Sequence, residues 1–334
     1  MKKYNVVVVG GGTGTHTVLR GLRAYADELN ITAVVSMADS GGSTGRLRDE
    51  FGVLPVGDVR NALTALASEG DESEVLLRQL FMYRFDRGDG LSGHNFGNLF
   101  LTALTDILGS EVAAIEAASC ILKASGRVIP VTTDNTELVA EYDTGAVVVG
   151  EENIDIALTC APDARIISLW LTPSATITPE AARAIEVADL LVFGPGDLYT
   201  SILANCVVGG FVEAVGKSQA TIVYVCNLMS KRGQTAGMHA AEHIAEIAKH
   251  IGRAPDIALI NSAPFSEDLV AKYEEEGDHP ILNNCSGDLC LIESQPLVSF
   301  EEVVLHSGDV LKRSLIRHDS AVLASALMTI VRSR

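Results

Sequence analysis

The sequence predicts a doubly wound α/β fold built on a mostly parallel sheet. Short runs rich in β-branched residues alternate along the chain with helical patterns, as in consecutive βαβ units. Several runs, such as VVVV at 6–9, are apolar throughout, as strands covered on both faces require. The 334 residues contain no Pro/Ser-rich linker, repeat or low-complexity tract. We therefore expect one domain over residues 1–334.

The elements are expected in a regular order along the chain. Their lengths and apolar periodicity distinguish strands from helices. Strands are expected at 4–9, 32–37, 127–130, 146–149, 165–169, 190–193, 221–226 and 257–260. Helices are expected at 17–29, 58–68, 74–81, 98–108, 111–122, 179–187, 239–249 and 320–331. The segment 71–122 is mostly helical, which predicts a helical subdomain beside the sheet.

Composition excludes several partners. With 43 Asp and Glu against 25 Lys and Arg, the formal net charge is −18, which disfavours nucleic acid and anionic membranes. No apolar run reaches the roughly 18 residues of a membrane span, so no membrane insertion is expected. The six cysteines form no CxxC pair and favour reduced thiols in a cytoplasmic protein.

The first candidate site is the turn after the first strand, Gly10–Gly14, with Thr13 inside it. Glycines let a backbone approach a ligand closely, and the N-terminus of the next helix attracts anions. The turn lacks the third glycine of the dinucleotide fingerprint, because Thr15 stands there, which argues against an NAD-dependent oxidoreductase. It also lacks the Lys-Ser/Thr of a Walker A loop. A phosphate cradle and a tight strand–helix turn both remain open.

The second candidate follows the next strand. Asp39 ends that strand, and the small or hydroxylated residues after it, with the cation Arg46, suit a phosphate-bearing ligand. Asp39 is placed to bind a ribose hydroxyl or a metal. Asp58, after Gly57, is either a helix cap or a ligand contact. Asp39 and Asp58 are the candidates for Mg²⁺, should a metal be needed.

Two further strand ends carry polar or glycine-rich turns. Gly194–Gly196 follow the strand at 190–193, and Asp197 either caps the next helix or faces a ligand. Asn227 ends the strand at 221–226. Nearer the carboxyl terminus, Tyr273 either stacks on a base or covers a helix end, and Arg317 either reaches a phosphate or pairs with a surface carboxylate.

Six stretches occur together in an order that marks a known family: GGGTGTHTVLRGL, DSGGSTGRLRDEFGVLPVGDVRNALTALA, SGHNFGNLFLTAL, FGPGDLYTSI, YVCNLM and LIRHD. The chain resembles the gluconeogenesis factors, bacterial cytoplasmic proteins related to the CofD-like 2-phospho-L-lactate transferases. The resemblance implies a Rossmann-like three-layer α/β/α fold. It also implies binding of a UDP-sugar, such as UDP-N-acetylglucosamine or UDP-glucose, and a regulatory role in cell shape and wall-precursor control on gluconeogenic carbon.

The resemblance also carries over a set of ligand-binding positions. They are Gly10, Gly11, Gly12, Thr13, Gly14, Asp39, Ser40, Gly41, Gly42, Ser43, Thr44, Arg46, Gly57, Asp58, Gly194, Pro195, Gly196, Leu198, Tyr199, Ser201, Asn227, Tyr273 and Arg317. The chain departs from the family at Val56, where a second proline is usual, and at Asp197, where a serine is usual. A carboxylate at 197 beside a phosphate implies that a metal or an arginine intervenes.

Two functions follow as alternatives. The first is a UDP-sugar-binding regulator that acts through protein partners and forms a homodimer. The second is a transferase that moves a phospholactyl group from a nucleotide donor to a deazaflavin precursor with Mg²⁺. The residues do not decide whether the protein catalyses a reaction. The DSGGSTGRLR version of the second block, which differs from that of the transferases, favours the regulator.

Overall fold

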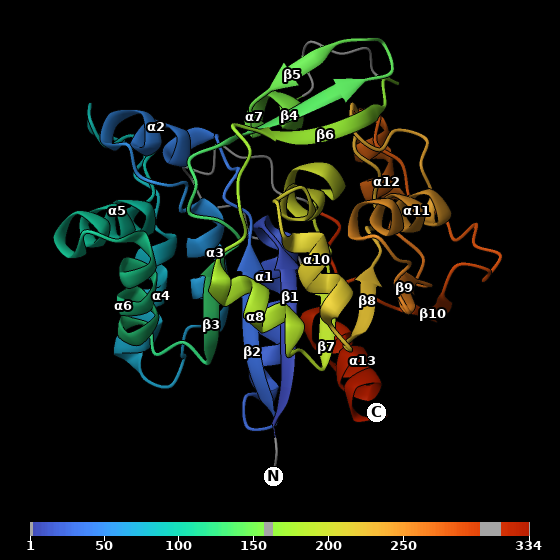
Figure 1. Cartoon of the computed structure of the whole chain (residues 1–334), viewed down its shortest axis with the longest axis horizontal. Coiled ribbons are helices and arrows are strands. Elements are labelled where there is room, and N and C mark those ends of the chain that lie inside the picture. Colours follow the sequence, from blue (N-terminus) through green and yellow to red (C-terminus); the bar gives the residue numbers. More distant parts are fainter. Residues whose placement is uncertain (1–2, 157–162, 301–314, 334) are drawn as a thin grey trace.

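A seven-stranded sheet forms the centre of the computed structural model, which describes residues 3–156, 163–300 and 315–333 (Figure 1). The strand order is β10-β9-β8-β7-β1-β2-β3, and every neighbouring pair is parallel. The strands are β1 (Tyr4–Gly10), β2 (Leu29–Val35), β3 (Gly126–Pro130), β7 (Leu190–Phe193), β8 (Thr221–Val225), β9 (Ile257–Asn261) and β10 (Leu291–Gln295). The predicted α/β fold is confirmed.

The strand order reverses between β1 and β7. From β1 the chain adds β2 and β3 on one side, whereas β7, β8, β9 and β10 follow in turn on the other side. The connections that leave these two neighbouring strands therefore diverge at their carboxyl ends. In open parallel sheets this switch point forms the crevice in which ligands bind.

Helices cover both faces of the sheet because its central strands are apolar on both sides. Val6 and Val8 of β1 belong to the core that contains α1 (Gly12–Leu22), α3 (Gly57–Leu66) and α13 (Ser320–Arg332). Val7 and Val9 belong to the opposite core, with α8 (Pro179–Glu186), α10 (Phe211–Lys217) and α11 (Ala240–Ile251). These two cores and the sheet make the three predicted layers.

The remaining helices surround the sheet. A group beside β3 consists of α4 (Glu72–Met82), α5 (Phe96–Leu108) and α6 (Glu111–Ile121), and α2 (Gly42–Phe51) contacts α5 (Figure 1). The side chains of Asp71, Asn95 and Ser110 cap the amino ends of α4, α5 and α6. The short elements are η1 (Arg23–Tyr25), α7 (Glu151–Ile156), the π-helix η2 (Leu198–Leu203), α9 (Ala204–Cys206) and α12 (Glu267–Glu274).

A second, antiparallel sheet was not expected. Its order is β5-β4-β6, with β4 at Glu137–Tyr142, β5 at Val147–Val149 and β6 at Ile166–Thr172. Two runs interpreted as members of the parallel series, 146–149 and 165–169, belong here instead. Each of these strands pairs antiparallel with β4 and leaves part of its length exposed. Short apolar runs in the sequence do not distinguish such strands from members of a parallel sheet. Strands β4 and β10 were missed.

Some element bounds also differ from expectation. Helix α1 begins at Gly12 rather than at 17, and β2 begins at Leu29, inside the expected helix 17–29. Helix α2 was missed because the glycines of its GSTGRLRDEF sequence suggested a loop. It forms because Leu47 is buried and Gly52, in the left-handed region, ends the helix by donating to the Arg48 carbonyl.

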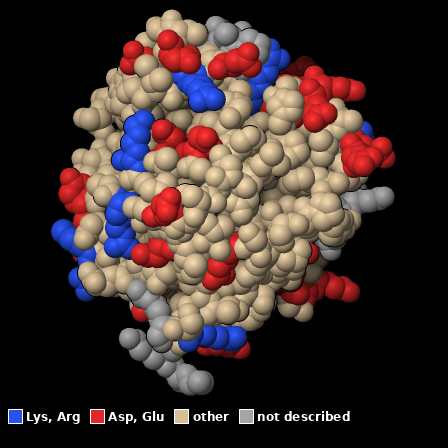
Figure 2. Space-filling model, turned by 90° about the vertical axis from the view of Figure 1, so that its right-hand side faces the viewer, with Lys and Arg blue, Asp and Glu red and all other residues tan. Residues whose placement is uncertain are grey.

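The surface carries charges of both signs, and the described cysteines form no disulfide. On the face shown in Figure 2, Lys and Arg are interspersed with Asp and Glu, and no continuous basic stripe is visible. Five of the six cysteines lie among the described residues and are free thiols, and Cys160 lies outside them. Within the described ranges, no helix has the length and apolar character needed to cross a bilayer.

Candidate functional site

Two glycine turns meet at the switch point. The first leaves β1 at Gly10, and the second leaves β7 at Gly194. A Cβ atom at Gly14 would lie only 2.1 Å from the Pro195 carbonyl oxygen, and one at Gly196 would lie 3.6 Å from the Gly11 oxygen. The two turns are thus in backbone contact, and glycine is needed at Gly14 because any side chain would force them apart.

Gly12 faces the open side of this junction. Its φ is +64°, in the left-handed region that favours glycine, and a Cβ atom there would meet only the Ser201 Oγ atom, at 3.7 Å. Gly12 is also the first residue of α1. The N–H groups at the start of a helix have no acceptor within the helix, so this end of α1 attracts negative charge.

The negative charge next to α1 belongs to Asp58. The Gly12 N–H donates to the Asp58 Oδ1 atom at 2.7 Å, and a Cβ atom at Gly11 would lie 2.1 Å from the Asp58 Oδ2 atom. Asp58 itself starts α3, and its carboxylate reaches across to α1 rather than capping its own helix. Asp58 therefore binds the amino end of α1 and does not cap its own helix, and its contact with a ligand stays a prediction.

Asp39 lies beside Asp58. A Cβ atom at Gly57 would be 2.1 Å from the Asp39 Oδ2 atom, and the Asp39 Oδ1 atom accepts from the Gly41 N–H at 3.0 Å. Burial and the charge of Asp39 raise the pKa of Asp58 to about 7. Burial also raises the pKa of Asp39 itself. Two carboxyl groups so close favour a shared proton or a cation.

Helix α7 adds carboxylates that the sequence did not reveal as site residues. Burial, followed by the charge of Asp39, raises the pKa of Glu151 to about 9. The Glu152 N–H donates to the Ser40 Oγ atom at 3.0 Å, and the Gly42 N–H donates to the Glu152 carboxylate at 3.4 Å. The segment after β2 is therefore hydrogen-bonded to α7, the helix that follows β5 of the antiparallel sheet.

Lys231 is the cation of this group. Its Nζ atom contacts the Asp155 carboxylate of α7 and lies 2.7 Å from the Asp197 Oδ2 atom. Burial disfavours the Lys231 charge, but Asp197 and Asp155 outweigh it and hold the pKa of Lys231 above its usual range. Burial also raises the pKa of Asp155. Burial opposes the Asp197 charge too, but Lys231 outweighs it and holds the pKa of Asp197 below its usual range.

This arrangement explains the unusual carboxylate at position 197. The charge of Asp197 is balanced by Lys231, which also joins the second glycine turn to α7. Sequence reasoning missed Lys231, although it lies four residues beyond Asn227, after the strand next to β7. A search for polar residues over the whole segment after each parallel strand would have found it.

Asn227 fixes the second glycine turn. Its Oδ1 atom accepts from the Gly196 N–H at 3.3 Å, and its Nδ2 atom donates to the Gly196 carbonyl at 2.7 Å. The paired hydrogen bonds use both ends of the side-chain amide. Asn227 therefore positions the turn in this structure.

The residues after β2 serve two places: Asp39 and Ser40 lie at the site, whereas Ser43, Thr44 and Arg46 contact the helices beside β3. Ser43 Oγ lies 3.2 Å from His94 Nδ1 and accepts from the Asn95 N–H, and Asn98 Nδ2 donates to Thr44 Oγ1 at 3.3 Å. Arg46 donates to the Ser92 carbonyl at 3.1 Å. Ser43, Thr44 and Arg46 thus hold α2 against the loop before α5.

The other sequence-predicted residues lie around the switch point or just beyond it. Leu198 and Tyr199 are buried in the core, whereas Ser201 faces Gly12. The Tyr273 hydroxyl accepts from the N–H groups of Leu315 and Ile316, and its ring packs on Leu228, Val298 and Ile316. The Nε2 atom of His318 donates to the Cys226 carbonyl at 3.1 Å, just beyond the end of β8. Arg317, the residue before His318, therefore lies near this end of β8.

Asp39 and Asp58 remain the only sequence-predicted metal candidates. Among the described residues, no group of three or more His, Cys, Asp or Glu side chains is arranged to hold a metal ion. A Mg²⁺ ion commonly uses one or two carboxylates together with phosphate oxygens of a ligand. Burial raises the pKa of both carboxyl groups, and the charge of Asp39 adds to the rise at Asp58, so a cation beside the pair would favour their ionised forms.

The comparisons with known proteins agree on one family. The profile of 2-phospho-L-lactate transferase CofD matches residues 6–294. The chain is 44% identical over 285 residues to the gluconeogenesis factor of Halalkalibacterium halodurans, covering 84% of this chain and 85% of that protein. It is 38% identical over 336 residues to the gluconeogenesis factor of Bacillus subtilis, covering 99% of each. A crystal structure of a Bacillus halodurans protein, 38% identical, matches with a TM-score of 0.87 over 98% of this chain and 100% of that chain. The chain therefore belongs to the CofD family and, within it, to the gluconeogenesis factors.

Proposed function

We propose that the protein binds a UDP-sugar at the switch point and acts as a regulator of gluconeogenic growth, cell shape and wall-precursor supply. The observation that carries the proposal is the contact between the Gly10–Gly14 and Gly194–Gly196 turns at the ends of β1 and β7. An extended ligand of base, ribose, diphosphate and sugar suits a crevice bordered by two such turns. The gluconeogenesis-factor relatives support the metabolic setting.

The diphosphate would lie at the start of α1, next to the open side of Gly12. Asp58 already accepts from the Gly12 N–H there, so an ionised Asp58 opposes a phosphate. A protonated Asp58 removes this repulsion, and its pKa of about 7 makes that form available near neutrality. A Mg²⁺ ion held by Asp39 and Asp58 would remove it as well.

Calorimetric titration with UDP-N-acetylglucosamine, with and without Mg²⁺, tests the proposal, with GDP and NAD as controls. The ligand is then recovered and chromatographed. Binding of an intact nucleotide sugar is expected. Turnover of the ligand, or binding of GDP without binding of the UDP-sugar, would favour the transferase over the regulator. Absence of binding in every titration would contradict a nucleotide site.

A variant at Ser201 separates the site from the fold. Ser201→Tyr fills the space beside Gly12 and is expected to abolish binding. Ser325→Tyr is the matched control, because Ser325 is exposed on α13. Equal binding by the Ser201→Tyr variant and the control would place the ligand elsewhere.

A further inference from the structure

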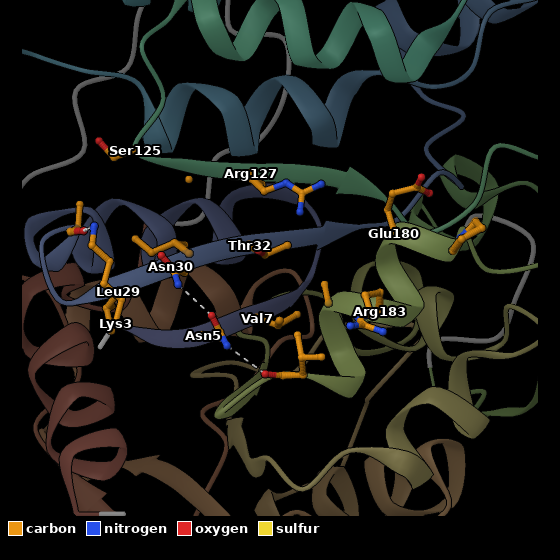
Figure 3. A pocket seen from close by; sticks show the side chains of 16 residues that line it. Lys3, Asn5, Val7, Leu29, Asn30, Thr32, Ser125, Arg127, Glu180 and Arg183 are labelled. Atoms are coloured by element: carbon orange, nitrogen blue, oxygen red, sulfur yellow. Dashed lines mark hydrogen bonds between the residues drawn. The ribbon is translucent and has the colours of Figure 1, made fainter. Parts of the chain in front are cut away.

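A cavity lies at the opposite, amino-terminal ends of the strands. It has a volume of about 650 Å³ and is bordered by the first halves of β1, β2 and β3 and by α8 (Figure 3). This volume is within the range of small-molecule pockets. We call it the amino-end groove.

The strands carry an unusual polar face in this groove. Asn5 of β1 is in register with Asn30 of β2, and Thr32 of β2 is in register with Val7 on one side and Arg127 of β3 on the other. Parallel strands covered on both faces are normally apolar, as the second half of β2 is. The polar residues therefore lie on the part of this face that the described helices leave accessible beside α8.

Two arginines reach the groove from different elements. Arg127 extends from β3 and Arg183 from α8, and Figure 3 shows them on opposite walls. Both side chains are exposed, and neither makes a hydrogen bond or ion pair with any residue in the part of the chain that the structure describes. With respect to the described residues, both guanidinium groups are therefore available to an anion in the groove.

Most of the charged side chains in the groove are positive. Lys3 lies at its edge and donates to the Ala26 carbonyl at 2.6 Å, and Glu180 on the first turn of α8 is its one carboxylate. The cavity is thus cationic in a chain of net charge −18. A guanidinium group matches the oxygens of a phosphate in a two-point contact.

We propose that the amino-end groove is a second ligand site, which binds a small phosphorylated metabolite through Arg127 and Arg183. The phosphate lies between the two guanidinium groups. The polar side chains of Asn30 and Thr32 face the remaining part of the bound metabolite. The site is separate from the glycine turns because it lies at the other end of the same strands.

Phenylglyoxal labelling of the full chain tests this site, because the reagent modifies accessible arginines. Inorganic phosphate is the probe, sodium chloride of equal ionic strength is the control, and rates are read for each arginine by peptide mass spectrometry. Arg127 and Arg183 should react about tenfold more slowly once phosphate exceeds its Kd roughly tenfold. Arg20, exposed on α1 and outside the groove, should be unaffected.

Two variants test whether the arginines share one anion. In Arg183→Gln, the protection of Arg127 at the same phosphate concentration should fall from about tenfold to about twofold, because one guanidinium group alone binds about tenfold more weakly. Glu180→Gln should lower the phosphate concentration that gives half-protection, because the substitution removes a negative charge that repels the phosphate. Equal protection of Arg20, or full protection of Arg127 in the Arg183→Gln variant, would overturn the proposal.

Discussion

The carboxylate of Asp58 accepts a hydrogen bond from the backbone N–H of Gly12 at 2.7 Å, so a residue at the start of α3 occupies the amino end of α1. This contact joins the first glycine turn to the second sequence block. It also makes the protonation of one carboxyl group relevant to any anion that approaches α1. Gly11 and Gly57 have no side chain because the carboxylates of Asp58 and Asp39 fill the space where one would lie.

Asp58→Asn should stabilise the protein at pH 8. The folded-state pKa of Asp58 is about 7, above its ordinary 3.8, so its charge opposes folding above pH 7, and this penalty disappears as the pH falls towards 3.8. The asparagine keeps an acceptor for the Gly12 N–H. We expect a gain of about 1–2 kcal/mol in the free energy of unfolding at pH 8, after allowing for solvent screening, and almost none at pH 4.

Urea unfolding at the two pH values measures this gain. Asp89→Asn, in an exposed loop, is the control and should change stability little at either pH. A gain that is equal at pH 4 and pH 8 would show that the effect does not come from the charge of Asp58.

Asp39→Asn should lower the pKa of Asp58. After burial, the charge of Asp39 is the next largest cause of the raised Asp58 pKa, so its removal leaves burial as the main cause. The carboxyl ¹³C shift of Asp58, followed through a pH titration, reports the change. An Asp58 pKa that stays near 7 in this variant would mean that the two carboxyl groups do not interact.

Lys231→Gln should destabilise the protein, because it leaves the carboxylates of Asp155 and Asp197 together without their cation. All three side chains are partly exposed, so the expected loss is about 1 kcal/mol near neutral pH. The low pKa of Asp197 means that the stabilisation is present above pH 3.8 and is lost as the pH falls through the folded-state pKa.

A double-mutant cycle of Lys231→Gln with Asp197→Asn measures the coupling between the two side chains. The cycle should give a favourable interaction energy at pH 7 and a smaller one in acid. A coupling of zero at both pH values would contradict the ion pair.

Gly14→Ala should destabilise the protein strongly. The new Cβ atom would lie 2.1 Å from the Pro195 carbonyl oxygen, so the two glycine turns must separate. Overpacking of this kind costs about 1–3 kcal/mol. Gly216→Ala is the matched control on α10, where a Cβ atom meets nothing within 4 Å, and it should stabilise by about 0.5–1 kcal/mol. Thermal unfolding compares the two, and equal stability would show that the turns are not in contact.

The α/β class and most of the parallel strands could be predicted from the amino-acid sequence, because apolar β-branched runs between helical patterns are local signals. It also indicated the glycine turns, which follow their strands directly, and Asp39, which lies four residues beyond the end of β2. Strands β4, β5 and β6 could not be assigned to a separate sheet, because strand pairing depends on contacts between distant segments.

Which of these features meet depends on how the chain folds. The order of the sheet places β1 beside β7, so the turns at Gly10–Gly14 and Gly194–Gly196, far apart in the sequence, come into contact. Helix α7, which follows β5 of the antiparallel sheet, brings Glu151 and Asp155 to the same place, where Lys231 contacts Asp155. Their raised pKa values arise from burial and neighbouring charges, and neither cause exists until the chain has folded.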